Sequence, residues 1–138
     1  MLENKEMPIR IEFNLKITDQ DIEDIVVTAI EGGIGYWACL DNTTEEWNEF
    51  EKSNLTTSEY CSKLLLDGKK LRFIDDEDRN TSWLLDIDML LNGIKMYIES
   101  CSTDIVDSGC FELDLCNLDA NSADCIFQYA LFKEIVYG

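Results

Sequence analysis

The sequence predicts a single α+β domain over residues 1–138, in which a mixed or antiparallel sheet carries about three to five helices mainly on one face. Apolar residues alternate with polar ones near the start of the chain and again around residues 69–87, as in strands with one buried face. Three other segments repeat apolar residues at helical spacing. With 138 residues and 46% hydrophobic content, the chain can bury one core.

The first elements are a strand and a well-marked helix. Residues 9–17 alternate strictly and predict a strand, with Pro8 at its start. The helix that follows has Thr18 as N-cap and Asp21 in position for a capping box, and Gly32 or Gly33 is expected to end it. A short strand is then predicted within residues 34–40.

The later elements differ in how clearly the sequence predicts them. Residues 43–54 and 57–66 are two weaker helix predictions. Residues 69–75 and 81–87 predict two strands joined by a polar hairpin connection. A helix is predicted over residues 86–101, with Asp86 or Asp88 as its cap, then a strand within 109–116 and a final helix over 119–132.

The glycine-rich stretch Glu31–Trp37 resembles a phosphate-binding loop, but its order is reversed. Phosphate loops lead from a strand into a helix N-terminus, whereas here a helix runs into the glycines and presents free carbonyl groups beside Glu31. The stretch therefore predicts a junction between a helix and a strand. The acidic run 75–78 lacks the order of a calcium loop and is better explained as a solvated hairpin tip.

The residue types present restrict the possible chemistry. Histidine is absent, which removes the commonest general base and metal ligand. The six cysteines have no C-x-x-C pair, and we expect buried free thiols without metal or other cofactor. No apolar run is long enough to span a bilayer, and the first residues do not resemble a signal peptide, so a cytosolic location is expected.

Acidity is the strongest feature of the composition. The net charge is −18, and no Lys or Arg occurs between Lys16 and Lys52 or between Lys95 and Lys133. Such a chain should be repelled by nucleic acid and anionic membranes and attracted to basic protein surfaces. Acids three or four positions apart on a helix can imitate spaced phosphates, although those at a helix start can also simply stabilise it. The candidate partner-binding residues are Asp19, Asp21, Glu23, Asp24, Glu45, Glu46 and Glu49.

Two stretches, ITDQDIEDIVVTAIEGGIGYW at residues 17–37 and ADCIFQYALFKEIVYG at residues 123–138, resemble the ends of a group of short acidic proteins. This group occurs in phages, prophages and mobile elements of Firmicutes. Lys133 stands where a glycine is expected in the group. The resemblance implies a genomic setting and no established activity.

The leading functional hypothesis is a non-enzymatic, phage-associated inhibitor of host defence in the host cytosol. It would bind a basic surface of a nucleic-acid-handling protein, possibly a CRISPR effector, by mimicking nucleic acid, without binding nucleic acid or membrane itself. One alternative is a sponge for a host nucleotide signal, for which the basic residues between Lys63 and Arg79 are the only candidate site. Another is a metal-dependent enzyme built on carboxylates.

Overall fold

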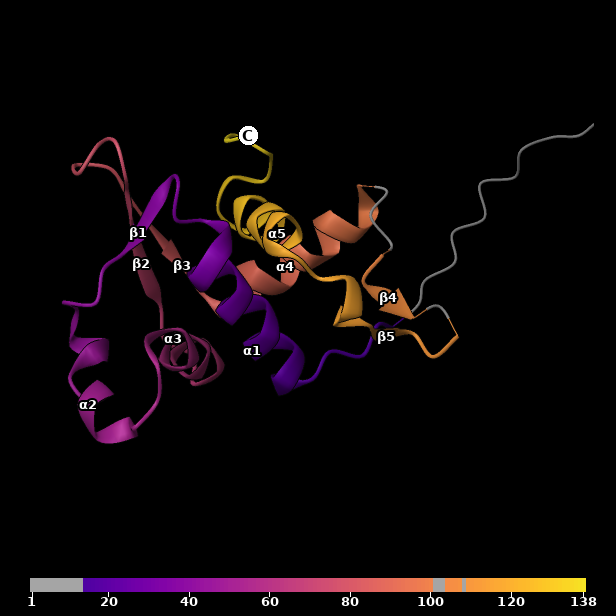
Figure 1. Ribbon diagram of the computed structural model, residues 1–138, viewed down its shortest axis with the longest axis horizontal. Helices are drawn as coiled ribbons and strands as arrows, with labels where there is room; N and C mark the ends of the chain where they lie inside the picture. The colour runs from indigo at the N-terminus through magenta and orange to yellow at the C-terminus, as the bar shows by residue number, and fades with distance from the viewer. Residues whose placement is uncertain (1–13, 101–103, 108) are drawn as a thin grey trace, which may run out of the picture.

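The computed structural model describes residues 14–100, 104–107 and 109–138 and confirms the α+β prediction (Figure 1). Within these residues, five α-helices accompany a three-stranded and a two-stranded sheet, both antiparallel. In Figure 1, α1, α4 and α5 lie to one side of the larger sheet. The helices are α1 (Asp19–Thr28), α2 (Phe50–Ser53), α3 (Thr57–Leu66), α4 (Ile87–Glu99) and α5 (Ala120–Phe132).

The larger sheet has the strand order β1 (Ala38–Leu40), β2 (Leu71–Asp75) and β3 (Ser82–Leu85). Phe73 in the central strand lies opposite Leu40 and Trp83, so these side chains share one face. Phe73, Leu71 and Leu85 on that face are fully buried, whereas Leu84 on the other face is 51% exposed. The helices therefore cover mainly one face, as predicted.

The first helix begins as the sequence predicts and ends in an unexpected geometry. The Thr18 side chain accepts from the Asp21 N–H, and Asp21 accepts from the Thr18 N–H, which completes the capping box. After Thr28 the chain makes a π-helical turn, Ala29–Gly33. A side chain at Gly33 would come within 3.0 Å of the Ala120 carbonyl oxygen, so glycine lets α1 approach the start of α5.

The strand predicted within residues 34–40 is shorter than expected. The N–H groups of Trp37 and Ala38 both donate to the Ile34 carbonyl in a turn, each at 3.0 Å, and β1 begins only at Ala38. The two aromatic rings before it still face opposite ways. Tyr36 is 54% exposed and Trp37 only 2%.

The region with the weak helix predictions contains three short elements. A 3-10 turn spans Glu45–Trp47, and α2 follows it as a single helical turn. By contrast, α3 has a full capping box between Thr56 and Glu59. The prediction of one helix over residues 43–54 is therefore wrong in extent, and the prediction for 57–66 is confirmed.

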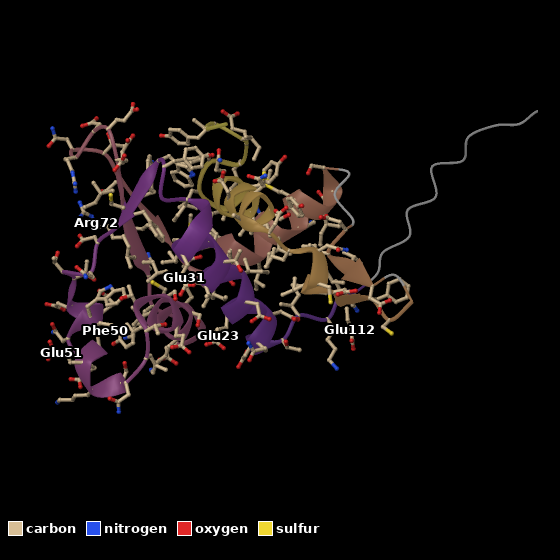
Figure 2. All side chains as sticks on the ribbon, viewed as in Figure 1. Glu23, Glu31, Phe50, Glu51, Arg72 and Glu112 are labelled. Carbon is tan, nitrogen blue, oxygen red and sulfur yellow. The ribbon has the colours of Figure 1, made fainter. Side chains whose placement is uncertain are left out.

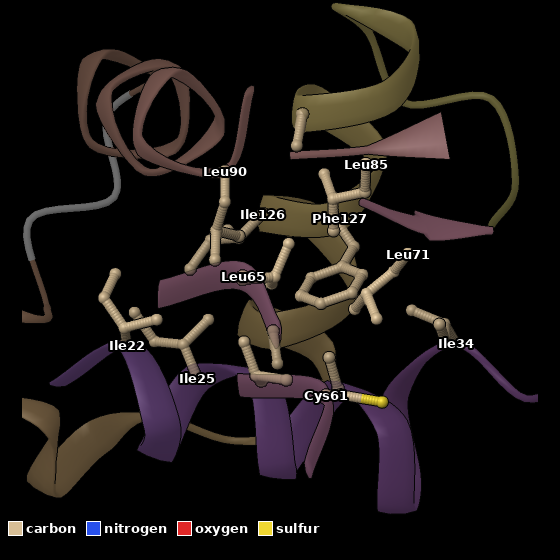
Figure 3. Close-up of a cluster of buried hydrophobic side chains, with 14 of the residues drawn as sticks. Ile22, Ile25, Ile34, Cys61, Leu65, Leu71, Leu85, Leu90, Ile126 and Phe127 are labelled. Carbon is tan, nitrogen blue, oxygen red and sulfur yellow. The ribbon is translucent and has the colours of Figure 1, made fainter. Parts of the chain in front are cut away.

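The core lies where α1, α3, α4 and α5 meet the sheet (Figure 3). Gly93 makes the contact between α4 and α5 possible, since a Cβ there would lie 2.5 Å from the Ile126 carbonyl oxygen. α5 ends at Lys133, whose φ of +64° belongs to the left-handed region that favours glycine. The fully buried core side chains include Ile25, Leu65, Leu71, Phe73, Leu85, Leu90, Ile126 and Phe127.

The smaller sheet joins β4 (Val106–Asp107) to β5 (Glu112–Leu113). The sequence indicates the second of these strands and not the first. Of the strand predicted over residues 9–17, positions 9–13 lie outside the described residues. Within the described part, Lys16 forms a parallel bridge with Glu112.

Two other expectations concern membranes and cysteines. No helix in the described ranges is long and apolar enough to cross a bilayer. The described cysteines are free thiols, as expected, but only Cys61 is buried, while Cys110 and Cys116 are exposed. Burial raises the pKa of the Cys61 thiol to about 12.

Candidate partner-binding site

An acidic groove of about 620 Å³ runs between α1, the start of α3 and the turn at Leu115–Leu118. We call it the α1–α3 groove. Its charged lining residues are Glu23, Asp24, Glu31 and Glu59, and its lining contains no Lys or Arg. The uncharged residues of its wall are Gln20, Val27, Thr28, Thr56, Leu115 and Leu118.

Helical spacing explains why these acids share one wall. Glu23, Asp24 and Glu31 lie on α1 and its π-helical turn at intervals that return to the same helix face. Figure 2 shows Glu23 and Glu31 along this part of the chain. Eight residues of helix separate them by roughly 12 Å along the axis. This span corresponds to about three or four phosphate steps of a duplex strand.

The carboxylates of the groove are held by neutral donors. Glu31 accepts a 2.7 Å hydrogen bond from the Ser58 hydroxyl, which connects α1 to α3. Asp24 accepts from the Gln20 side-chain amide at 2.9 Å. Hydrogen bonds from Thr56 lower the pKa of Glu59. Among the described residues, none of the four groove carboxylates forms an ion pair, so their charge faces solvent uncompensated.

The structure divides the seven predicted partner-binding residues among four places. Only Glu23 and Asp24 lie in the α1–α3 groove. Asp21 belongs to the capping box of α1, so the alternative that it stabilises the helix start is confirmed for this residue. Asp19 lies beside an apolar hollow that includes Ile22 and Leu66.

The other three predicted residues, Glu45, Glu46 and Glu49, line a separate groove of about 450 Å³ between the 45–49 segment and α3. We call it the α2–α3 groove. Its wall also contains Lys63 and Lys69, and Glu49 lies 3.5 Å from the Lys52 ammonium group. The prediction that these glutamates extend one acidic surface with α1 is therefore wrong. The fold brings cations to them that the sequence places many positions away.

The basic residues between Lys63 and Arg79 are also divided by the fold. Lys63 pairs with Asp67 on the same helix. Arg72 pairs with the buried carboxylate of Asp41, whose pKa is lowered mainly by hydrogen bonds from Thr43 and further by Arg72. Two of the five basic residues on which the nucleotide-sponge alternative depends are thus held in internal ion pairs.

Local hydrogen bonds account for the acidic residues at the hairpin tip. Asp75 accepts from the Glu77 and Asp78 N–H groups, and Asp78 accepts from the Asn80 N–H and the Thr81 hydroxyl. Across the described residues, no group of three or more Cys, Asp or Glu side chains is arranged to hold a metal ion.

A buried polar network that sequence reasoning missed joins α5 to the turn before β1 and to the C-terminal residues. Asp124 is buried on α5 and accepts hydrogen bonds from the Trp37 indole at 2.7 Å, the Tyr36 hydroxyl at 2.5 Å and the Gln128 amide at 2.9 Å. Burial, with the hydrogen bond to the Asp124 carboxylate, raises the pKa of Tyr36 to about 12.

Gln128 connects this network to the C-terminal residues. Its side-chain oxygen accepts from the N–H groups of Val136 and Tyr137, both at 2.8 Å, and its amide donates to the Tyr137 carbonyl at 3.0 Å. The Tyr137 ring stacks on Trp37 with 5.1 Å between ring centroids. The available sequence signal was the pair of polar residues Asp124 and Gln128, four positions apart, at the border of the apolar stripe of α5.

The network joins the two stretches on which the family resemblance depends, because Tyr36 and Trp37 end the first stretch and Asp124, Gln128 and Tyr137 belong to the second. Among the described residues, no buried side-chain nitrogen or oxygen lacks a hydrogen-bond partner, which is the arrangement of a structural clamp. Comparison of the chain with protein-family models, curated proteins and solved structures found no match.

Proposed function

We propose that the protein binds a basic surface of a host protein that handles nucleic acid, and that it blocks that protein's nucleic-acid site. The observation that carries this proposal is the α1–α3 groove, whose four carboxylates line one hollow without a cation. A groove with walls of low dielectric focuses the field of such charges toward a positive partner.

The contact would use charges that are already held in place. The hydrogen bonds to Asp24, Glu31 and Glu59 orient their carboxylates before any partner arrives, which lowers the entropy cost of binding. The overall charge of −18 adds long-range attraction that accelerates encounter. This attraction weakens as salt screens the charges.

The class of target follows from charge complementarity and from the phage setting that the resemblance implies. Proteins that hold DNA or RNA present basic channels spaced for phosphates. An RNA-guided nuclease of a host defence system has such a channel and acts in the cytosol, where this inhibitor would meet it. The protein would act by occupying the channel and would catalyse no reaction.

The test compares two triple variants that change the charge equally. Glu23→Gln, Asp24→Asn and Glu31→Gln together remove three charges from the α1–α3 groove. Glu45→Gln, Glu46→Gln and Glu49→Gln remove three from the α2–α3 groove, whose wall, unlike that of the α1–α3 groove, also contains Lys63 and Lys69. Amides keep an acceptor oxygen for Gln20 and Ser58, so the local hydrogen bonds can persist.

The measurement is inhibition of target-DNA binding by a purified RNA-guided nuclease, at salt concentrations from about 50 to about 200 mM. We expect the first triple variant to inhibit at least about tenfold more weakly than the unaltered protein, and the second to remain close to it. Equal losses in both variants would show that total charge matters and the groove does not. An unaltered protein that fails to inhibit would contradict the proposed target.

A further inference from the structure

The segment Leu15–Ile17 forms a single parallel β-bridge, at Lys16, and its other edge has no backbone partner among the described residues. The Lys16 N–H donates to the Phe111 carbonyl at 2.9 Å, so Lys16 faces the β4–β5 hairpin. In an extended chain the peptide groups of successive residues point to opposite edges. Those of Leu15 and Ile17 therefore point away from β5, and in the described part of the chain they have no backbone partner. Such an edge can accept another strand.

Apolar hollows lie beside this open edge. One of about 340 Å³ lies between Leu15, Ile17 and the α4 residues Leu91, Ile94 and Ile98. A second of about 370 Å³ continues past Leu91 to Leu66 and Ile87. Leu91 and Leu66 are 37% and 38% exposed, which is unusual for side chains that share an apolar surface. The open edge and the hollows together match an extended peptide with apolar residues at alternate positions.

The chain itself contains such a peptide immediately before this segment. Residues 9–13 read IRIEF, with apolar side chains at alternate positions and Arg10 and Glu12 between them. β5 begins at Glu112, the bridge partner of Lys16, so the hairpin offers no strand partner to residues that precede Asn14. An antiparallel copy of the same peptide fits the open edge, because equal strands can pair about a two-fold axis.

We propose that two copies of the chain associate by exchanging residues 9–13, each peptide pairing with the Leu15–Ile17 edge of the other copy. Its apolar side chains fill the hollows along α4, and the contact is isologous. The charge of the exchanged peptide is compatible with association of two copies. Residues 1–13 contain three Glu against one Lys and one Arg, a net charge of −1 out of −18. Lys16 and Lys95 lie at this contact, each near a glutamate: Lys16 is 4.0 Å from Glu112, and Lys95 is 3.9 Å from Glu99.

The dimer should respond to salt in the opposite way to the proposed partner binding. Two molecules of charge −18 repel each other over distances comparable to the Debye length, so added salt favours the apolar contact. This difference makes the two proposals separable, because dimerisation can be measured without any nucleic-acid-handling protein. Either proposal can fail while the other holds.

The experiment measures the molar mass of the full-length protein by light scattering after size exclusion, at low and high salt. We expect about twice the 15.9 kDa of one chain, with more dimer at high salt. Leu91→Glu places a charge in the hollows, and Ile11→Asp places one on the exchanged peptide, so each should give a monomer. Leu84→Glu is the matched control, because Leu84 is an exposed leucine on the open face of the sheet and should leave the dimer intact.

Circular dichroism of each variant confirms that it is folded, and Ile11→Asp remains informative if Leu91→Glu is not. A monomeric unaltered protein at both salt concentrations would overturn the proposal. A dimer that resists Ile11→Asp would also overturn it, because association would then use another surface. If Leu84→Glu abolished the dimer as fully as Leu91→Glu, the dimer contact would not be specific to the hollows along α4, and the proposal would be wrong.

Discussion

The carboxylate of Asp124 on α5 and the carboxylates of the α1–α3 groove differ in their surroundings. Asp124 is buried and accepts three hydrogen bonds from groups distant in sequence. Glu23, Asp24 and Glu31 line an open groove and accept at most a local or single cross-helix bond. The hydrogen-bonding capacity of Asp124 is used within the fold, whereas the groove carboxylates can still bind a partner. In a chain with 29 acids, this distinction identifies candidate binding residues better than acidity does.

Of the variants considered, Asp124→Ala is expected to lower the free energy of unfolding most. Removing the carboxylate leaves the Trp37 indole N–H and the Gln128 amide buried without an acceptor, and it loosens the C-terminal residues that Gln128 holds. A loss on the order of 3 kcal/mol in the free energy of unfolding is expected. Urea unfolding followed by fluorescence measures it.

Asp124→Asn is the control for that variant. Its remaining oxygen can still accept from Trp37 and Gln128, and the Tyr36 hydroxyl can rotate to accept from the new amide. We expect a clearly smaller loss than for alanine. If both variants were as stable as the unaltered protein, the network would not be a structural clamp.

Asp41→Asn extends the comparison to a second partnered carboxylate, at the sheet edge. The pKa of Asp41 is lowered by hydrogen bonds from Thr43 and by Arg72. When a carboxyl group has a lower pKa in the folded state, it stabilises the fold at pH values above its pKa in the unfolded state, which is about 4. This stabilisation is lost as the pH falls through the pKa of the folded state. The variant should therefore lose about 1 to 2 kcal/mol at neutral pH.

The pH dependence of stability distinguishes loss of the Asp41 charge from a general disturbance of the fold. The difference between the variant and the unaltered protein should shrink as the pH falls below about 4, because Asp41 then becomes protonated and loses its advantage. Thermal unfolding over a pH series measures the difference. A constant difference down to the most acidic pH would mean that the Asp41 charge is not responsible.

Local sequence signals predicted those parts of the fold that local interactions determine. The capping box at Thr18, the cap at Asp86 and the hairpin between β2 and β3 each depend on residues a few positions apart. The π-helical turn at Ala29–Gly33 was not predictable in this way. There the backbone adapts to α5, whose Ala120 carbonyl lies against Gly33.

The candidate site was only partly predictable for the same physical reason. On α1, the spacing of three or four positions pairs Asp21 with Asp24, but Asp21 belongs to the capping box, and it is Glu23 that joins Asp24 in the groove. The other side of the groove comes from Glu59 and Thr56, whose position depends on how α3 packs against α1. Likewise, a tract without Lys or Arg in the sequence did not make Glu45, Glu46 and Glu49 free of cations, because folding brings Lys63 and Lys69 beside them.

The smallest expected effect on stability is that of the triple variant Glu23→Gln, Asp24→Asn and Glu31→Gln. The substitutions relieve repulsion among neighbouring acids, and the amide oxygens can keep the hydrogen bonds from Gln20 and Ser58. The acids of the first turn of α1, Asp19 and Asp21, are unchanged, so the interaction with the helix dipole is kept. The free energy of unfolding should therefore change by no more than about 0.5 kcal/mol. Urea unfolding of this triple variant and of Asp124→Ala, measured in parallel, compares their free energies of unfolding directly. A loss above about 1 kcal/mol would show that the groove acids also hold the fold, and weaker inhibition by this variant could then not be assigned to lost contacts.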